Sequence, residues 1–480
     1  MTTPALTGSD EERQGIRGSV VMSVAALVGF VTALDNTIIA AAAPSIGREL
    51  GLSLSTVQWV SLAYMLPYAG LLLAAGALID RLGRRRVLLV GCAVFAAGAL
   101  IGSVGRSAEV LIGARVLQGV AAAFIVPGTL SLIRTELPVP RRAVAIGVWT
   151  AALACALALG PWLGGALAEH LHWSWIFLCN LPFVGVALAL LARTRAVESV
   201  RSDVRLRLGA AALVTVSLIL LTASAVTPGS LITAAVLGGV GVLGLLFFVM
   251  RERHDNTPLV PARLWANRVF LGANALTLLW GLGISGIVFF TPLVYQDFLG
   301  MRPDVAGLPL VVVAGAVICT TPLVPVATRA LGPHRAVCFG LLVLAMGLAQ
   351  LAVVNEATTV APRLVGLVLA GAGSAFSAPI TGHALDLIGE DDTGTASGVL
   401  TASRELSSAF GVVLIGIVLT VVRAGEIADG VPEGPALGNG YTAALVVAAL
   451  LQLVGAALAL VVLRPRTVAK SLPVNKCEGT

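Results

Sequence analysis

The sequence predicts an all-α integral membrane protein, made of two six-helix bundles with two further helices between them. Its composition is the first reason: 57% of the 480 residues are apolar and 12% are charged, with a mean hydropathy of +0.95. A soluble domain carries about twice that share of charged residues. The other two reasons are a series of long apolar stretches and an internal repeat.

Fourteen apolar stretches are each long enough, at about 20 residues, to cross a bilayer as a helix. They centre near residues 31, 68, 96, 121, 156, 184, 217, 240, 280, 316, 345, 371, 409 and 452. The seventh and eighth are separated by the turn-forming segment Thr227-Pro228-Gly229-Ser230. The first, from Val20 to Pro44, exceeds the core of a signal peptide, which is about 7 to 15 residues, so we expect it to remain in the membrane.

Basic residues are distributed unevenly over this topology. Twenty-four of the 31 Lys and Arg residues fall in the termini and in the loops on the same side as the termini, and five fall on the opposite side. Those five are Arg48, Arg106, Arg302, Arg363 and Arg423. The positive-inside rule therefore places both termini in the cytoplasm, with the chain in the cytoplasmic (inner) membrane. Topology explains the net charge of +6, which gives no reason to expect nucleic acid as a partner.

The chain repeats itself at an offset near 250 residues. The segment 147–151, Gly-Val-x-Thr-Ala, recurs at 398–402, and Ala-Phe-x-x-Pro at 123–127 recurs at 375–379. Leu82-Gly83-x-x-Arg86 has an echo in Leu331-Gly332-x-x-Arg335. Each match is weak, but nearly equal offsets indicate two parallel six-helix halves. We expect a tail at 1–17, a first bundle at 18–193, two inserted helices at 194–268, a second bundle at 269–463 and a tail at 464–480.

The two halves differ in charge. The repeat aligns Asp80 with Arg329, and Arg115 with Leu367, so the acid and the intramembrane base occur in the first half only. We therefore expect the chemistry of the protein to concentrate in the first half.

The loop after the second stretch reads Gly76-Ala77-Leu78-Ile79-Asp80-Arg81-Leu82-Gly83-Arg84-Arg85-Arg86. It resembles the loop signature of the major facilitator superfamily, Gly-x-Leu-x-Asp-Arg-x-Gly-Arg-Arg. The resemblance implies alternating access of a transporter, with a conformational switch formed by Gly76, Asp80, Arg81, Gly83, Arg84 and Arg85. The alternative, a basic cytoplasmic loop of any membrane protein, explains the arginines but not the glycines or the acid.

Asp35 lies inside the first stretch, nine residues before Pro44 and thus about 13 Å below the end of the helix. An acid at that depth is expensive unless it faces a polar cavity, where it can exchange protons, or pairs with a buried base. Leu34-Asp35-Asn36-Thr37-Ile38-Ile39 resembles the first-helix signature of the fourteen-span drug:proton antiporters, with departures at Ala40 and Ala43. The resemblance implies proton coupling at Asp35 and makes Asn36 and Thr37 candidates for the substrate pocket.

Arg115 lies in the fourth stretch at a depth compatible with that of Asp35, and no neighbour in sequence neutralises it, so its partner must come from another helix. The surrounding segment, which includes Gln118 and Gly119, resembles the fourth-helix signature of the superfamily. There the arginine is associated with proton coupling, and Gln118 becomes a further pocket candidate. The competing interpretation is a fixed counter-ion that only holds helices together.

The fifth stretch contains Ala156-x-x-x-Gly160-Pro161-x-x-Gly164-Gly165, which resembles the antiporter signature except at Ala156. Within the superfamily this motif favours exporters, whereas simple packing of small residues is the alternative. The segment Trp173 to Gly185 also resembles the fourteen-span family, with Ser174 in place of an arginine. In the second half, we expect Arg404 and Glu405 to form an ion pair near the interface.

The sequence gives no indication of a cofactor, a metal site or an enzyme. The six cysteines lack metal-ligand spacing, and no Gly-x-x-x-x-Gly-Lys-Ser/Thr segment is present, so an ion gradient must supply the energy. We therefore expect a monomeric, proton-coupled antiporter that exports drugs or antibiotics. Its partners are a small amphipathic substrate, protons and the lipid bilayer. The alternative is export of an endogenous metabolite, such as a self-made antibiotic, an amino acid or a siderophore.

Overall fold

The computed structural model describes residues 8–193 and 208–464, without 228, 256, 257, 358, 387 and 389–392. Within these residues the chain is helical and contains no strand. Thirteen helices, some of them made of consecutive segments, are long and apolar enough to cross a membrane. Helix α2 (Leu54–Leu82), which is 29 residues long, makes the fourteenth. The predicted all-helical membrane fold is thus confirmed.

The first half consists of α1 (Gly8–Leu50), α2, α3 (Arg84–Val104), α4 (Ala108–Glu136), α5 (Val139–His170), α6 (Trp175–Leu178) and α7 (Asn180–Arg193). The inserted pair is α8 (Leu208–Val226) and α9 (Leu231–His254), followed by the short α10 (Ala262–Ala266). The second half consists of α11 (Arg268–Asp297), α12 (Pro303–Ala306), α13 (Leu308–Thr320), η1 (Thr321–Leu323), α14 (Val324–Leu331), α15 (Pro333–Val353), η2 (Ala361–Arg363), α16 (Leu364–Ala375), α17 (Ala378–Asp386), α18 (Thr393–Ala428) and α19 (Glu433–Val462).

Side-chain caps mark several helix starts. Ser53 accepts a hydrogen bond from the backbone N–H of residue 56 at the start of α2, and Ser230 does the same for residue 233 at the start of α9. Asn267 accepts from the N–H groups of residues 269 and 270 at the start of α11. These oxygens satisfy donors that the first helical turn leaves free. These capping side chains therefore mark the residues at which α2, α9 and α11 begin.

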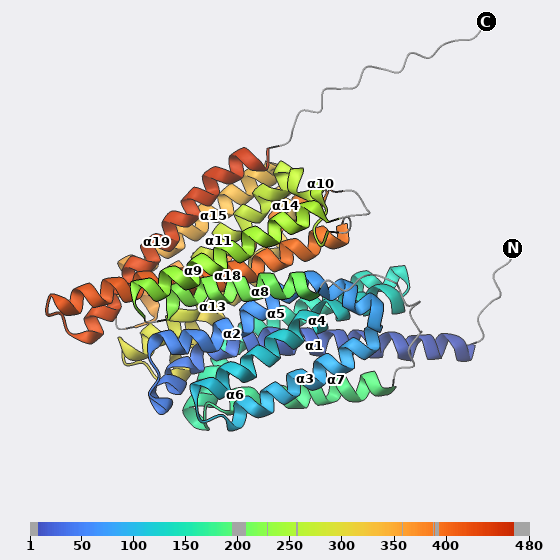
Figure 1. Cartoon of the computed structure of the whole chain (residues 1–480), viewed down its shortest axis with the longest axis horizontal. Coiled ribbons are helices and arrows are strands. Elements are labelled where there is room, and N and C mark those ends of the chain that lie inside the picture. The colour runs from blue at the N-terminus through green and yellow to red at the C-terminus, as the bar shows by residue number, and fades with distance from the viewer. Residues whose placement is uncertain are drawn as a thin grey trace, which may run out of the picture.

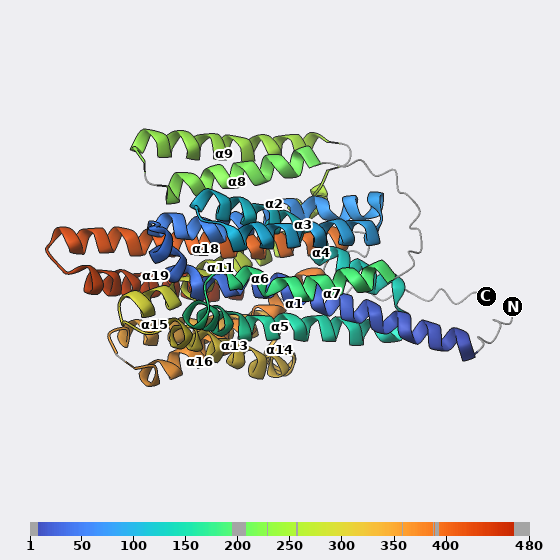
Figure 2. The same cartoon turned by 90° about the horizontal axis from the view of Figure 1, so that it is seen from below.

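The inserted pair lies at the side of the bundle, as Figure 2 shows. Helix α8 packs against α2, where Gly70 leaves no room for a Cβ beside Thr215. Trp59 donates its indole N–H to Thr227, which ties α2 to the turn between α8 and α9 (3.2 Å). Helix α9 packs mainly on α8, through Gly241, and its remaining face is exposed. The expectation of two helices outside the twelve of the repeat is confirmed.

The helices alternate in direction and define two ends of the molecule (Figures 1 and 2). We call the end where α1 begins and α2 meets α3 the near end. We call the opposite end, where α1 meets α2 and α18 meets α19, the far end; it lies on the left in Figure 2. These names refer to the molecule only and not to a side of the membrane.

The internal repeat is visible in the backbone. Gly83, between α2 and α3, has a φ of 86°, and its repeat equivalent Gly332, between α14 and α15, has a φ of 77°. Both values favour glycine, because a Cβ is strained there. Gly119 on α4 approaches the backbone of α2, and its equivalent Gly371 on α16 approaches the backbone of α13, in each case without space for a Cβ. Equivalent glycines thus make equivalent turns and contacts in the two halves.

Candidate functional site

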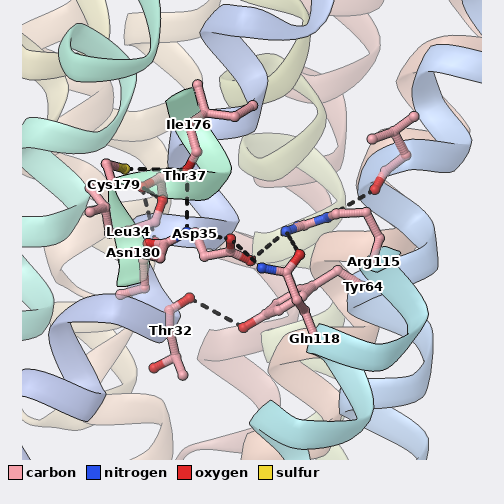
Figure 3. Close-up of polar contacts among 12 residues, drawn as sticks. Thr32, Leu34, Asp35, Thr37, Tyr64, Arg115, Gln118, Ile176, Cys179 and Asn180 are labelled. Atoms are coloured by element: carbon pink, nitrogen blue, oxygen red, sulfur yellow. Dashed lines mark hydrogen bonds and ion pairs between the residues drawn. The ribbon is translucent and has the colours of Figure 1, made fainter. Parts of the chain in front are cut away.

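A buried ion pair lies within the first half. Arg115 on α4 donates from Nη1 to Oδ2 of Asp35 on α1, as Figure 3 shows. The Arg115 side chain is 0% exposed and that of Asp35 is 2% exposed. A buried base therefore does find its partner on another helix, at the same depth, and the two residues singled out in the sequence contact each other directly.

Three side chains donate to the Asp35 carboxylate. Besides Arg115, the amide Nε2 of Gln118 donates to Oδ1 (2.9 Å) and the amide Nδ2 of Asn180 donates to the same oxygen (2.8 Å). They come from α4 and α7, so three helices including α1 meet at the acid. An ionised carboxylate only accepts hydrogen bonds. A ring of donors therefore matches the charged form of Asp35.

The guanidinium of Arg115 is held on several sides. Its Nε donates to the carbonyl oxygen of Val60 on α2 (3.1 Å), and Nη1 also donates to Oε1 of Gln118 (3.2 Å). The guanidinium carbon lies 4.4 Å from the ring centre of Tyr64, a cation–π contact. Tyr64 in turn donates its hydroxyl to the carbonyl oxygen of Thr32 (3.2 Å; Figure 3). Among the described residues, Nη2 of Arg115 is buried without a partner.

Glycines bring the helices of this site close together. At Gly119, a Cβ would meet the backbone of α2 at Tyr64. At Gly160 and Gly164 on α5, a Cβ would meet α1 at Thr37 and Ile38. Small residues at such positions allow close helix packing in membranes. The site therefore depends on α1 being held against α5 and on α2 being held against α4.

The three pocket candidates have different surroundings. Gln118 is fully buried and belongs to the Asp35 network. The hydroxyl of Thr37 contacts carbonyl oxygens within α1 and that of Ala156 on α5, so in this conformation it connects two helices. Asn36 is partly exposed, and its Oδ1 has no partner among the described residues. Of the three, Asn36 has a polar group left for a ligand.

Comparison with known proteins assigns the chain to a family. A family model described as the Major Facilitator Superfamily matches residues 25–412. The chain belongs to the major facilitator superfamily. Members of this superfamily carry small molecules across membranes on two bundles of helices.

Several relatives of this chain have names that state a function. The tetracenomycin C resistance and export protein of Streptomyces glaucescens is 31% identical over 86% of this chain and 78% of its own length. The puromycin resistance protein pur8 of Streptomyces alboniger is 32% identical over 94% of this chain and 92% of its own. The multidrug efflux pump LfrA of Mycolicibacterium smegmatis is 30% identical over 87% and 83%.

Solved structures support the fold. A bacterial homologue of the human lysosomal transporter Spinster, in an inward-facing and unoccupied conformation, superposes with a TM-score of 0.68 at 17% identity, covering 93% of this chain and 97% of that one. The D-xylose–proton symporter superposes with a TM-score of 0.62 at 16% identity, covering 90% and 96%. The major facilitator fold is thus shared despite low identity.

The superfamily loop motif joins α2 to α3 at the near end. Gly83 provides the turn with positive φ. Arg84 donates from Nε to the Ser131 hydroxyl on α4 (2.8 Å). Arg85 donates to the carbonyl oxygens of Leu191 and Ala192 in the last turn of α7, each at 3.0 Å, where a cation also interacts favourably with the helix dipole. Both arginines therefore stabilise the first half internally.

The other members of the loop motif make fewer contacts. Arg81 is exposed, and Gly76 has open space where a Cβ would lie. The side chain of Asp80 lies outside the described part of the structure. The role of the loop as a conformational switch stays a prediction.

The segment Gly160-Pro161-x-x-Gly164-Gly165 of α5 connects the two halves as well as packing on α1. A Cβ at Gly165 would meet the backbone of Pro303 on α12, in the second half. Conversely, a Cβ at Gly307 would meet the carbonyl group of Pro161 on α5. The backbones of α5 and of the α12–α13 turn are therefore in direct contact at the far end.

Sequence reasoning missed two members of the site. Asn180 stands in the segment Trp173 to Gly185, which resembles the family pattern, but its contact with Asp35 was not expected. Tyr64 had no signal at all, because a tyrosine in an apolar helix usually serves packing. Its position becomes evident only when α2 and α4 are brought together.

One sequence expectation was wrong. Among the described residues Arg404 makes no ion pair with Glu405; its guanidinium lies 5.3 Å from the ring centre of Trp280. Adjacent residues on a helix point in different directions, and the guanidinium of Arg404 lies over the aromatic ring of Trp280 on α11. Trp173 is 2% exposed and donates its indole N–H to Glu49 (2.7 Å).

Proposed function

We propose that the protein is a proton-coupled antiporter that exports drugs or antibiotics by alternating access. Family membership and the exporter relatives support transport of this kind. The single observation that carries proton coupling is the buried carboxylate of Asp35, paired with Arg115 and surrounded by donors. An intramembrane acid of this kind is a functional site by default.

Proton binding would dismantle this network. A protonated Asp35 carries a hydrogen on one oxygen, while the three side chains around it are all donors. The new O–H needs an acceptor that these donors do not supply, and Arg115 would remain buried without its counter-ion, which is strongly unfavourable. Arg115 would then move toward another acceptor, and the helices that carry it would follow. Protonation and deprotonation of Asp35 thereby favour different conformations.

The positive-inside rule supports a cytoplasmic location of the near end and of both termini in the cytoplasmic membrane. In the part of the chain that the structure describes, hydrogen bonds and ion pairs join the halves at the far end, between α1 or α5 and α11 or the segment 302–304. Under this orientation the present conformation is closed to the outside. The chain acts as a monomer, with bundles at 18–193 and 269–463 moving against each other and the inserted helices at 194–268 beside them.

The substrate is a small amphipathic molecule. Two of the relatives are named for resistance to tetracenomycin C and puromycin, and others for resistance to methyl viologen. Export of an endogenous product remains the second candidate, because resistance proteins in Streptomyces species stand among the relatives.

The proposal is tested with Asp35→Asn in proteoliposomes under an imposed pH gradient, with puromycin and methyl viologen as substrates. The substitution keeps the volume and removes the titratable group, so proton-driven transport should fall by at least about tenfold while exchange of substrate without a gradient persists. Asp386→Asn, which changes an exposed carboxylate at the near end, serves as the control. Wild-type transport by Asp35→Asn under the gradient would exclude Asp35 as the coupling acid.

A further inference from the structure

Glu405 on α18 is an intramembrane acid that the proposed mechanism does not use. It lies about 18 Å along the helix from the start of α18, whereas the hydrocarbon core of a bilayer is about 30 Å thick. It is partly exposed, and among the described residues its carboxylate makes no hydrogen bond or ion pair. The carboxylate of Asp35, by contrast, has three donors. Of the two acids, Glu405 therefore has oxygen atoms left to bind a ligand.

Arg404, the neighbouring base, is held away from Glu405. Its guanidinium carbon lies 5.3 Å from the centre of the Trp280 ring on α11, a cation–π contact. The indole N–H of Trp280 donates to the hydroxyl of Ser374 on α16 (3.2 Å), which fixes the orientation of the ring. Arg404 is exposed, and the described part of the structure shows no hydrogen bond from its guanidinium. The aromatic ring therefore keeps this positive charge where it makes no ion pair with the acid.

Glu405 faces the first half of the protein. Helix α18 packs against α2, and Glu405 interacts electrostatically with Tyr68 and Tyr64 on that helix. The ring of Tyr64 also contacts Arg115, so Glu405 lies near the Asp35 site, although no hydrogen bond joins the two among the described residues. A carboxylate near aromatic rings suits an organic cation, because the carboxylate attracts the charge and the ring faces attract it as well.

We propose that Glu405 binds a cationic group of the transported substrate, and that Trp280 keeps this site vacant by holding Arg404 on its ring. The inference rests on the proposed export of a small amphipathic molecule and adds that this molecule is an organic cation. Glu405 is then a binding residue, whereas Trp280 and Arg404 are positioning residues. If Arg404 left the ring, its flexible side chain would bring a positive charge toward Glu405 and compete with the substrate.

Equilibrium binding of methyl viologen, a planar organic dication, tests the site without a pH gradient. Isothermal titration calorimetry of the lipid-reconstituted full chain gives the dissociation constant. Glu405→Gln keeps the volume of the side chain and removes its charge, so the dissociation constant should rise about five- to tenfold. Glu426→Gln is the matched control, because this glutamate lies on the same helix about 32 Å away, near the far end, and accepts a hydrogen bond from Asn439. It should bind methyl viologen as the wild type does.

The uncharged bipyridine from which methyl viologen derives by methylation separates recognition of charge from packing. It has the same aromatic rings without the positive charges. Its dissociation constant should be higher than that of methyl viologen in the wild type and should not change in Glu405→Gln. A loss of affinity for both probes in Glu405→Gln would show that Glu405 shapes the pocket rather than recognising charge, and would overturn the proposal.

A rescue experiment tests the role of Trp280. Trp280→Leu should release Arg404 and raise the dissociation constant of methyl viologen about three- to tenfold. Adding Arg404→Gln should restore at least the affinity of the wild type, because no base is then left to compete for Glu405. A second substitution cannot rebuild lost packing, so a purely structural role of Trp280 would not be rescued. Failure of the rescue would overturn the positioning role of Trp280.

This inference and the proposed function fail in different ways. Loss of proton coupling is seen in the transport assay of Asp35→Asn and leaves these dissociation constants as expected. Wild-type affinity of Glu405→Gln for methyl viologen, or no binding of methyl viologen to the wild type, would overturn the cation site and leave proton-coupled export of an uncharged substrate in place.

Discussion

Gln118 contacts both members of the buried ion pair: its Nε2 donates to Asp35 (2.9 Å) and its Oε1 accepts from Arg115 (3.2 Å). The amide therefore connects the acid and the base in a closed set of three hydrogen-bonded groups. Because an amide can both donate and accept, it cannot reverse without breaking both contacts. A change in the charge of Asp35 therefore affects Arg115 in two ways: through their direct contact and through the hydrogen bonds of Gln118.

Arg115→Leu, which introduces the residue of the repeat-equivalent position 367, should give an inactive or uncoupled protein. It leaves the Asp35 charge buried without a counter-ion, and breaking a buried pair in this way costs about 3–5 kcal/mol. Adding Asp35→Asn removes that charge, so the double variant should be more stable than Arg115→Leu alone. Thermal unfolding in detergent measures the stability of Arg115→Leu relative to that of the double variant. If transport in Arg115→Leu kept its wild-type pH dependence, Arg115 would be only a fixed counter-ion.

Asn180 should stabilise the ionised form of Asp35 in particular. A hydrogen bond to a charged group is worth about 1.5–3 kcal/mol, more than one to a neutral group. We expect Asn180→Ala to destabilise the wild type by more than it destabilises Asp35→Asn, because the charge is absent in the second background. A double-mutant cycle on unfolding free energies measures the difference. Equal costs in the two backgrounds would show that Asn180 serves packing alone.

Much of this site could be predicted from the sequence. Asp35 and Arg115 are conspicuous because charges in apolar helices are rare, and their depths can be counted along the helices. Asn180 and Tyr64 are different. Their side chains are common in membrane helices, and what makes them members of the site is the close packing of α1, α2, α4 and α7, which only the folded structure provides.

The arginines of the far end show the same limit. The predicted topology places five arginines on the side of the membrane opposite to the termini, but the role of each depends on its tertiary neighbours. These five are Arg48, Arg106, Arg302, Arg363 and Arg423. Arg48 and Arg302 bridge the halves, whereas Arg106 pairs with Glu49 of its own half. Arg363 is fully buried and donates to the carbonyl oxygen of residue 355, with the ring centre of Tyr295 at 4.7 Å. The pattern of charges along the sequence predicts on which side of the membrane an arginine lies, but not which residue it contacts.

Asp80→Asn should shift the protein toward the conformation that is closed at the far end and should slow turnover. The reason is that an acid at a helix end can pair with a helix N-terminus or a base of the other half in the alternative conformation. Substrate affinity from the near end should change little. Accessibility of single cysteines at the far end to a membrane-impermeant reagent measures the shift. Unaltered labelling rates would mean that the loop is only a topological anchor.

Gly164→Ala should separate α1 from α5 and disturb the site without touching a charge. A Cβ at 164 would lie 3.1 Å from the carbonyl carbon of Ile38 and closer still to its oxygen, and neither backbone atom can move aside. We expect a loss of about 1–3 kcal/mol in stability, as for other overpacked positions, together with impaired transport. Gly147→Ala is the matched control, because it lies on the same helix with open space around it and should be neutral or slightly stabilising. Equal behaviour of the two variants would show that close approach of α1 and α5 is not needed to align Asp35 with Arg115.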